Sequence, residues 1–434
     1  MARHLIRIDS RRCGRSNSLS LKGSFNRATL PAMDVDVSLN SRNHARLVTG
    51  VTIAGFCVFL QLYAPQPLLV LFRRVFDASE AQVSLIVSAA TLAVALTSPF
   101  VGMLADAVGR KRIIVPCLFA LSLSTLACGL SQNLSTIIFW RFISGICTPG
   151  VIAVTLAYIS EESPSRSAGS VTALYVTGTV LGGLTGRLGA AFTADHLSWR
   201  WSFALLAILT FIGAIAAWRL LPRSTRFKPQ TDWRTGLVAL ASHLRNGPLM
   251  ATCFTGFIVL FSHVGLFTYI NFYLARPPFS LSTSALGAMF LVYALGIVVT
   301  PLSGKVIDRT GHRAGAAASV ALVIAGCLLM FVPALLAIIV GVAIASTGVF
   351  VGQAAASSHI GRAAKGARSA ASGLYVSCYY LGGSAGATAL VVPWRRGDWP
   401  AIVACIIAAQ LVSLMVSWRF FARSPQHTLP FPIE

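Results

Sequence analysis

The stretch Pro99-Phe-Val-Gly-Met-Leu-Ala-Asp-Ala-Val-Gly-Arg-Lys-Arg112 ends one apolar run, turns on two glycines and begins another apolar run. A second version, Pro301-Leu-Ser-Gly-Lys-Val-Ile-Asp-Arg-Thr-Gly-His-Arg313, repeats its proline, its aspartate and both glycines at a constant offset of 202 positions. A charged glycine turn between two apolar runs, present twice at this distance, predicts a protein of two homologous membrane halves.

Two further pairs of motifs support the duplication. Leu174-Tyr-Val and the glycines after it recur at Leu374-Tyr-Val, and Trp218-Arg recurs at Trp418-Arg, both at an offset of 200. Because these landmarks keep their register apart from a two-residue insertion or deletion, we expect the halves to share one orientation and the same number of spans.

The composition excludes an ordinary soluble domain. Apolar residues make up 55% of the chain and charged residues 11%, and the apolar runs are close to twenty residues long. A run of that length crosses a hydrocarbon core of about 30 Å. In a soluble chain the net charge of +22 would suggest nucleic acid as a partner, but here it indicates membrane topology. The nine cysteines are scattered without metal-binding spacing, so we expect no metal and no cofactor.

We therefore expect an all-α membrane protein with twelve transmembrane helices in two pseudo-symmetric six-helix bundles. The expected spans are 48–72, 80–107, 113–131, 135–160, 168–192 and 201–221, then 248–275, 284–308, 314–333, 336–358, 368–392 and 399–421. The bundles occupy 47–221 and 248–421, and the polar, basic segment 222–247 links them.

Both ends are expected to be cytoplasmic tails. Residues 1–46 carry nine Lys and Arg and no sustained apolar segment, which predicts a disordered basic tail. The tail contains Met33, so translation from Met1 and translation from Met33 are both open. Residues 422–434 form the second tail.

The distribution of Lys and Arg predicts the orientation, because cationic residues translocate poorly. With the amino terminus inside, the inner segments hold 27 of these residues and the outer segments seven, and Arg141 lies within a span. Without the amino-terminal tail the ratio is still 18 to seven. The outer seven are Arg73, Arg74, Arg187, Arg200, Arg276, Arg395 and Arg396. We expect a multi-pass protein of the bacterial inner membrane with both termini in the cytoplasm.

The turn also has an architectural interpretation, in which its glycines let two helices approach closely and its basic residues anchor it at the anionic inner leaflet. Its pattern G-x-L-x-D-x-x-G-R-K, however, resembles the signature between the second and third helices of the major facilitator superfamily, and the resemblance extends from Leu47 to Phe421. It implies a rocker-switch transporter, in which two bundles open a central cavity alternately to each side. By position it implies a cytoplasmic gating latch, not substrate ligands, at Gly102, Asp106, Gly109, Arg110, Gly304, Asp308, Arg309 and Gly311.

Arg141 is the charged residue that the sequence places inside the fourth span. An intramembrane arginine is costly and normally faces a cavity or a partner, but snorkelling to the outer interface is an alternative here. The local R-x-x-x-G pattern resembles the fourth-helix motif of the family, which implies a role in proton coupling. The family often has glutamine where Ser144 stands.

The glycine stretch from Gly178 to Arg187 in the fifth span has a small-xxx-small spacing, for which helix packing is the plain explanation. It also resembles the fifth-helix glycine motif of family exporters, although it lacks their Gly-Pro pair. Together with Tyr63-Ala-Pro-Gln-Pro-Leu-Leu69 and Trp199-Arg-Trp201, it resembles the bacterial arabinose-efflux and drug-efflux-like permeases.

Polar and aromatic side chains within the spans are candidates to line a substrate cavity. Those residues are Gln61, Tyr63, Gln66, Tyr269, Asn271, Tyr293, Gln353, Tyr375 and Tyr379. For Tyr375, Tyr379 and the neighbouring Tyr380, cavity lining and helix packing are both open. His263 can either titrate near neutral pH or simply bond a neighbouring helix.

All thirteen acidic residues lie in tails, turns or span ends. A fixed intramembrane carboxylate is the usual proton carrier, so coupling would have to use Asp77 or Glu80 at the outer mouth, Asp106, or His263 together with Arg141. No Walker lysine motif, zinc spacing or Ser/His/Asp arrangement is visible, and we do not expect an enzyme.

The leading hypothesis is a monomeric secondary transporter that exports a small organic molecule, a drug or a sugar, against proton entry. An uptake symporter or uniporter of the same fold is the alternative. A receptor would need a large sensory domain, and a channel would need a continuous polar stripe.

Overall fold

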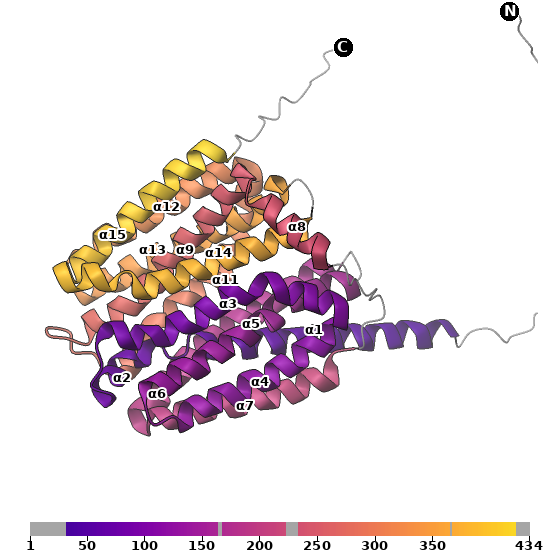
Figure 1. Cartoon of the computed structure of the whole chain (residues 1–434), viewed down its shortest axis with the longest axis horizontal. Coiled ribbons are helices and arrows are strands. Elements are labelled where there is room, and N and C mark those ends of the chain that lie inside the picture. The colour runs from indigo at the N-terminus through magenta and orange to yellow at the C-terminus, as the bar shows by residue number, and fades with distance from the viewer. Residues whose placement is uncertain (1–31, 164–166, 223–232, 365–366, 422–434) are drawn as a thin grey trace, which may run out of the picture. The chain divides into compact units, whose positions relative to one another are not determined.

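The computed structural model describes residues 32–163, 167–222, 233–364 and 367–421, and none of these residues lies in a strand (Figure 1). The described residues from Asn43 to Phe421 belong to one compact unit, which contains all the expected spans. The expected tails at 1–31 and 422–434 lie outside the described residues.

The first half contains seven α-helices and one short 3-10 helix. They are α1 (Ala32–Leu62), η1 (Gln66–Leu68), α2 (Leu69–Val75), α3 (Glu80–Val108), α4 (Arg110–Leu130), α5 (Leu134–Glu162), α6 (Ala168–His196) and α7 (Trp199–Leu220). Helix α1 begins at Ala32, whereas the sequence analysis placed a disordered tail up to residue 46. No glycine or proline lies between Ala32 and Val48, so nothing in the covalent chain stops the helix there.

The second half repeats the order of the long helices, but its 3-10 helix lies within the second span and not at the end of the first. Its helices are α9 (Gly247–Leu274), α10 (Thr283–Ala288), η2 (Met289–Ala294), α11 (Leu295–Thr310), α12 (His312–Leu329), α13 (Leu335–Ala363), α14 (Arg368–Thr388) and α15 (Val391–Phe420). Helix α15 is interrupted at Gly397 and Asp398, where Asp398 has a φ of 52°. Its long part therefore begins near Trp399, where the sequence predicted the last span.

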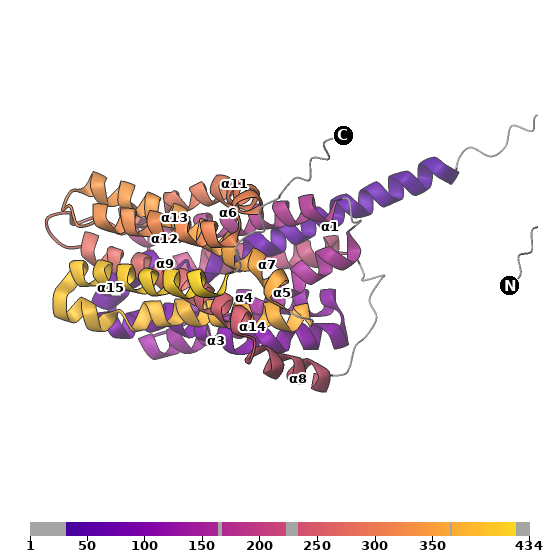
Figure 2. The same ribbon diagram turned by 90° about the horizontal axis from the view of Figure 1, so that it is seen from above.

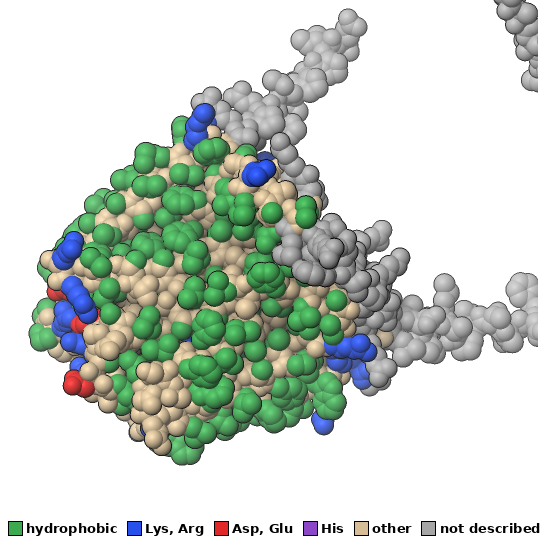
Figure 3. All heavy atoms as spheres, viewed as in Figure 1, with side chains coloured by type: hydrophobic (Ala, Val, Ile, Leu, Met, Phe, Trp, Pro, Cys, Tyr) green, Lys and Arg blue, Asp and Glu red, His purple; other side chains and the backbone are tan. Residues whose placement is uncertain are grey.

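Ten helices among the described residues are long and apolar enough to cross a membrane. Helices α6 and α14, which have 29 and 21 residues, occupy the places of the expected fifth and eleventh spans but are not among the ten. Charged side chains gather at the two ends of the described surface and leave an apolar middle zone (Figure 3). The all-helical membrane fold is confirmed, and the count of twelve spans stays a prediction.

The glycines of α6 and α14 explain why these two helices are less apolar. A methyl group at Gly182 or Gly186 would overlap with backbone carbonyl oxygens of α1. The equivalent Gly382 and Gly386 of α14 face backbone carbonyl oxygens of α9 in the same way. Small residues at such positions let two helix backbones approach closely. The geometry supports helix packing as the role of these glycines.

The two halves meet along a surface that we call the seam. Helix α3 packs along α14, and the two lie side by side in both views of the ribbon (Figures 1 and 2). On the other edge α6 packs against α10 and η2, while η1 and α2 pack against α9.

The linker between the halves contains α8 (Trp233–His243). Gly236 of α8 lies beside the Met103 side chain of α3, and His243 Nε2 lies 3.3 Å from the carbonyl oxygen of Ala367. Helix α8 therefore contacts both halves at one end of the molecule, which we call the inner end. The opposite end, which holds the turns at 76–79 and 275–282, is called the outer end. Both names follow the orientation that the Lys and Arg distribution predicts.

Candidate functional site

The first helix is broken inside the first half, at the point where the sequence has two prolines. Helix α1 ends at Leu62, and the chain continues through Tyr63 and Pro65 into the buried helix η1. Proline removes a backbone donor, so the last carbonyl groups of α1 lack their usual intrahelical partners. The break thus leaves carbonyl groups of α1 in a buried, apolar region without donors from their own helix.

Arg141 of α5 binds these carbonyl groups. Its guanidinium donates to the carbonyl oxygen of Gln61 at 3.1 Å, to that of Leu62, and to that of Ile86 on α3 at 3.3 Å. The residue is 2% exposed. A cation at the carboxyl end of a helix is favoured by the helix dipole. Arg141 therefore lies inside the first half and does not snorkel to the interface, and its role in coupling stays a prediction.

A second buried arginine corrects the sequence analysis, which counted Arg187 among the outer residues. Arg187 lies two turns inside the end of α6 and is 2% exposed. Its Nε donates to Gln66 Oε1 at 3.2 Å, and its Nη1 donates to the carbonyl oxygen of Gly183 at 2.8 Å. The expected end of the span at residue 192 was too early, because α6 continues to His196.

Three aromatic rings surround the Arg187 guanidinium. Its central carbon lies 5.0 Å from the ring centroid of Tyr63, 5.0 Å from that of Phe290 and 4.3 Å from that of Tyr293. Each distance suits a cation–π interaction. Tyr63 belongs to the first half, whereas Phe290 and Tyr293 belong to η2 of the second half. We call Arg187 and these three rings the arginine cage; it spans the seam.

Four buried polar atoms at or next to the cage lack a hydrogen-bond partner among the described residues. They are Tyr63 Oη, Gln66 Nε2, His263 Nδ1 and Asn271 Oδ1. The His263 ring lies 4.8 Å from that of Tyr293, and Asn271 Nδ2 donates to the Gln66 carbonyl oxygen at 3.4 Å. Buried polar groups are normally satisfied, so a cluster of such atoms at one place favours a binding role.

The structure thus brings together five of the predicted residues: Tyr63, Gln66, Asn271, Tyr293 and His263. Among the other cavity candidates, Tyr379 lies beside the cage, since it interacts electrostatically with Tyr63 and Tyr293 and packs against the same buried cluster. The remaining candidates lie elsewhere. Gln61 Oε1 accepts a hydrogen bond from Thr125 inside the first half, and Tyr269 donates to the Ala387 carbonyl oxygen at 3.0 Å. Tyr375 and Tyr379 stack on each other along α14 with centroids 5.9 Å apart, and Gln353 is half-buried on α13.

The predicted latch is an ion-pair network in the first half. Arg110 binds Asp106 at 2.5 Å and Glu161 at 2.6 Å, which ties α3, α4 and α5 together at the inner end. Gly109 has a φ of 109°, which a residue with a side chain rarely adopts. Glu161 was missed because it lies far from the motif in the sequence, at the end of α5.

The second copy of the latch is built differently. Asp308 and Arg309 are exposed and form no ion pair among the described residues. Instead Arg362 Nη1 lies 3.3 Å from His312 Nδ1, and these two residues stand where the first half has Glu161 and Arg110. Gly311 again has a positive φ, of 90°.

The sequence analysis offered close helix approach as a role for the glycines of each turn, and for the first glycine of each turn this interpretation is wrong in this conformation. A methyl group at Gly102 or Gly304 would meet nothing within 4 Å. These two glycines therefore permit no close helix approach here, because the helix faces on which they lie carry no packed neighbour.

Contacts between the halves close the outer end. Arg276 of the second half pairs with Glu80 of the first at 3.2 Å, and the hydroxyl groups of Ser88 and Ser384 lie 2.7 Å apart. Asp77, a coupling candidate, is exposed and lines a cavity of about 280 Å³ beside these contacts. The basic residues of that cavity are Arg73, Arg74 and Arg276.

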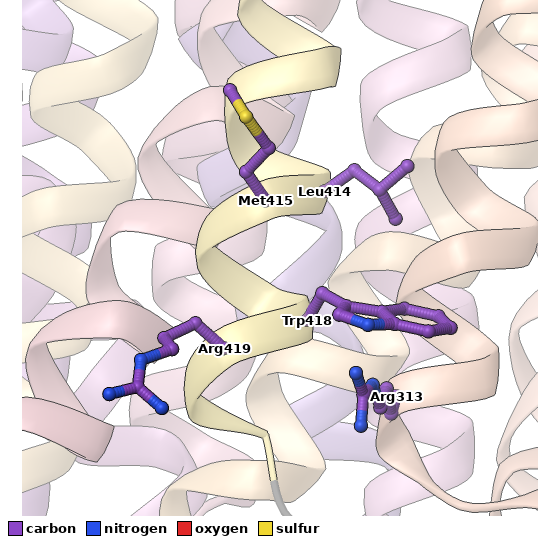
Figure 4. A pocket seen from close by; sticks show the side chains of 5 residues that line it. All are labelled: Arg313, Leu414, Met415, Trp418 and Arg419. Atoms are coloured by element: carbon purple, nitrogen blue, oxygen red, sulfur yellow. The ribbon is translucent and has the colours of Figure 1, made fainter.

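A larger groove of about 740 Å³ lies away from the seam, on α12 and α15 (Figure 4). The Arg313 guanidinium lies 3.7 Å from the ring centroid of Trp418, and Arg419 extends on the other side of α15. Trp418 and Met415 are 54% and 63% exposed, so the groove opens on the outside of the second half. It is not part of the path between the halves.

Comparisons with known proteins agree with this architecture. Residues 51–387 match the Major Facilitator Superfamily. An uncharacterized MFS-type transporter of Bacillus subtilis (strain 168), YybF, is 32% identical over 86% of this chain and 92% of its own. The inner membrane transport protein YnfM of Escherichia coli (strain K12) is also 32% identical, over 87% of this chain and 91% of its own.

Among solved structures, the nucleoside transporter NupG superimposes on 87% of this chain and all of its own with a TM-score of 0.72, at 14% sequence identity. At that identity the likeness shows the fold alone. The family match and the relatives define a multi-pass membrane transporter that handles a small-molecule substrate. The chain belongs to the major facilitator superfamily.

Proposed function

We propose that the protein works as a single chain in the bacterial inner membrane and exports a small organic solute by alternating access, in exchange for protons. The observation that carries this proposal is the cluster of buried polar atoms at the seam, beneath an outer end closed by Glu80–Arg276 and Ser88–Ser384. A polar site between two bundles that are joined at one end is what an alternating carrier requires.

His263 is the coupling candidate best placed for a proton carrier. It is 6% exposed, contacts the rings of Tyr293, Phe267 and Phe350, and has no carboxylate partner among the described residues. The charged group that acts on it is Arg187, which lies close enough for an electrostatic interaction. Arg141 is held by backbone carbonyl groups, and Asp77 lies at the outer surface. Histidine is also the side chain whose ordinary titration range falls nearest to neutral pH.

Alternating access can be tested by locking the outer end. Ser88→Cys and Ser384→Cys place two thiols where the hydroxyl groups now touch. A ligand is first found by thermal-shift screening of sugars, amino acids, organic acids and cationic drugs. Oxidation of the double variant should stop transport of the radiolabelled ligand, and reduction should restore it. Each single variant under the same oxidant is the control. Continued transport by the cross-linked protein would contradict alternating access.

Direction and coupling are tested in everted membrane vesicles. Export predicts that the radiolabelled ligand enters the vesicles when their interior is acidic, and that nigericin, which collapses the pH gradient, prevents entry. Equal movement with no gradient would reject proton coupling and favour a uniporter. Accumulation driven only by the opposite gradient would favour an uptake symporter.

A further inference from the structure

We propose that the transported solute is a monovalent organic anion with an aromatic body, and that Arg187 binds its carboxylate. This inference rests on the proposed function in one respect, namely that the solute passes along the seam. It adds the chemical class of the solute and the group that recognises it.

The first step is the charge of the cage. Within the part of the chain that the structure describes, no carboxylate lies within ion-pairing distance of Arg187. The other buried arginines are compensated: Arg110 binds two carboxylates, and Arg141 binds three backbone carbonyl groups. A buried cation without an anion is unfavourable in a membrane protein and usually marks a functional site.

The second step is the direction of the hydrogen bonds that remain open. Tyr63 Oη and Gln66 Nε2 are buried donors without a partner, and both residues contact Arg187. A carboxylate has only acceptor atoms and binds a guanidinium in a two-pronged arrangement. Arg187, Tyr63 and Gln66 therefore present the donors that a carboxylate needs, on the first-half side of the seam.

The third step concerns the body of the solute. Tyr63, Phe290 and Tyr293 surround the guanidinium with aromatic faces and edges, and Tyr293 keeps part of its surface exposed. Small-molecule sites combine such apolar walls with a few polar groups that fix the ligand. Ring pairs prefer offset or edge-to-face contacts, which these side chains can make with an aromatic solute.

The cage also explains how the solute could affect the conformation. Arg187 belongs to α6 of the first half, and two of its three rings belong to η2 of the second half. An anion that takes over the guanidinium replaces contacts that now join the halves. Only a ligand with different affinities for two conformations can shift their populations, and this replacement supplies such a difference. In addition, the inside-negative potential favours outward movement of an anion, so it adds to the driving force for export of this class.

The test uses the purified full-length chain and matched pairs of probes in which a neutral carboxamide of the same shape replaces the carboxylate. Thermal unfolding is measured with benzoate and benzamide, and with 2-naphthoate and 2-naphthamide. The acids should raise the melting temperature of the wild type in a saturable way, and the amides should not. Arg187→Gln should weaken acid binding by about 30-fold or more, since a charge-assisted pair in a buried site is lost.

Arg200→Gln is the matched control. Arg200 also lies on an aromatic ring, 4.4 Å from that of Trp199, and donates to two carbonyl groups, but it is outside the cage. This variant should bind the acids as the wild type does. If Arg187→Gln does not fold, Arg187→Lys serves instead: it should keep the preference for acids over amides with reduced affinity.

Four outcomes would overturn the inference. They are equal binding of acids by Arg187→Gln, equal binding of acids and amides by the wild type, loss of acid binding in Arg200→Gln, and absence of acid binding over both pairs. Transport in proteoliposomes separates the two proposals. Binding of an acid at Arg187 without any transport would keep the inference and reject the proposed function. Gradient-driven export of a neutral solute that does not depend on Arg187 would keep the proposed function and reject the inference.

Discussion

Two arginines, Arg141 and Arg187, are equally buried in the first half, yet their surroundings differ in kind. Arg141 binds backbone carbonyl groups of α1 and α3, which belong to the same half as itself. Arg187 contacts side chains from both halves, and most of its neighbours are aromatic rings. The comparison teaches that burial alone does not assign a role to an arginine. Backbone partners within one bundle indicate a structural role, which we call the frame, whereas side-chain partners across the seam indicate a binding site.

The largest effect on stability should follow removal of the frame arginine. Arg141→Met leaves the carbonyl groups of Gln61, Leu62 and Ile86 without donors. Each buried group that loses its partner costs about 1–3 kcal/mol, so the free energy of unfolding should fall by about 3–5 kcal/mol. Arg187→Met should change it by less than about 1 kcal/mol, because loss of the ring contacts and of the hydrogen bonds to Gln66 and to the Gly183 carbonyl oxygen is offset by removal of a buried charge that has no anion. Denaturant unfolding in detergent measures both. Equal losses in the two variants would remove the distinction between frame and site.

The second prediction concerns the glycines that bring Arg187 to the break in α1. Gly186→Ala should lower the free energy of unfolding by about 2 kcal/mol, since its methyl group would overlap with the Leu60 carbonyl oxygen. Gly189→Ala is the matched control on the same helix, because a methyl group there would meet nothing within 4 Å. The free energy of unfolding of Gly189→Ala should equal that of the wild type or be slightly higher. If Gly186→Ala has the same free energy of unfolding as the wild type, the close packing of α6 on α1 is contradicted.

Much of the fold could be predicted from the sequence because its signals are local. The glycine turns fix Gly109 and Gly311 at positive φ, and apolar runs of about twenty residues mark the spans. Pro65 and Pro67 follow Tyr63 closely, and α1 ends at Leu62 because proline breaks a helix. The repeat at an offset of 200 predicted two matching halves, and the equivalent glycines of α6 and α14 pack in the same manner.

The candidate site could be predicted only in part, because its decisive contacts join distant segments. Tyr63, Gln66, Asn271, Tyr293 and His263 were found as polar or aromatic residues within spans. Arg187 was missed, since a short estimate of the fifth span placed it near the membrane surface. Its neighbour Phe290 was missed because a phenylalanine in an apolar run carries no signal. An arginine directly after Gly186, on a helix face that packs closely, is the signal that would have identified it.

A third prediction compares the two copies of the latch. Asp106→Asn should lower the rate of transport by about tenfold, because Arg110 then loses one of its two carboxylates at the inner end. The variant should remain folded and inserted. Asp308→Asn is the matched control: Asp308 is exposed and unpaired among the described residues, so transport should fall by less than about twofold. Undiminished transport by Asp106→Asn would exclude the latch from the mechanism.

The smallest effect should come from the ring nearest to the Arg187 guanidinium. Tyr293 lies 4.3 Å from it, and contact between its ring and the ring of a bound aromatic acid contributes about 0.5–1.5 kcal/mol, or about two- to tenfold in affinity. Tyr293→Phe keeps an aromatic face and should bind 2-naphthoate within about twofold of the wild type. Tyr293→Leu removes the face and should bind it about fivefold more weakly. If both variants lose affinity alike, the hydroxyl group and not the ring contacts the anion. That result would keep Arg187 as the anion-binding residue, but Tyr293 would then act as a hydrogen-bond donor, as proposed for Tyr63.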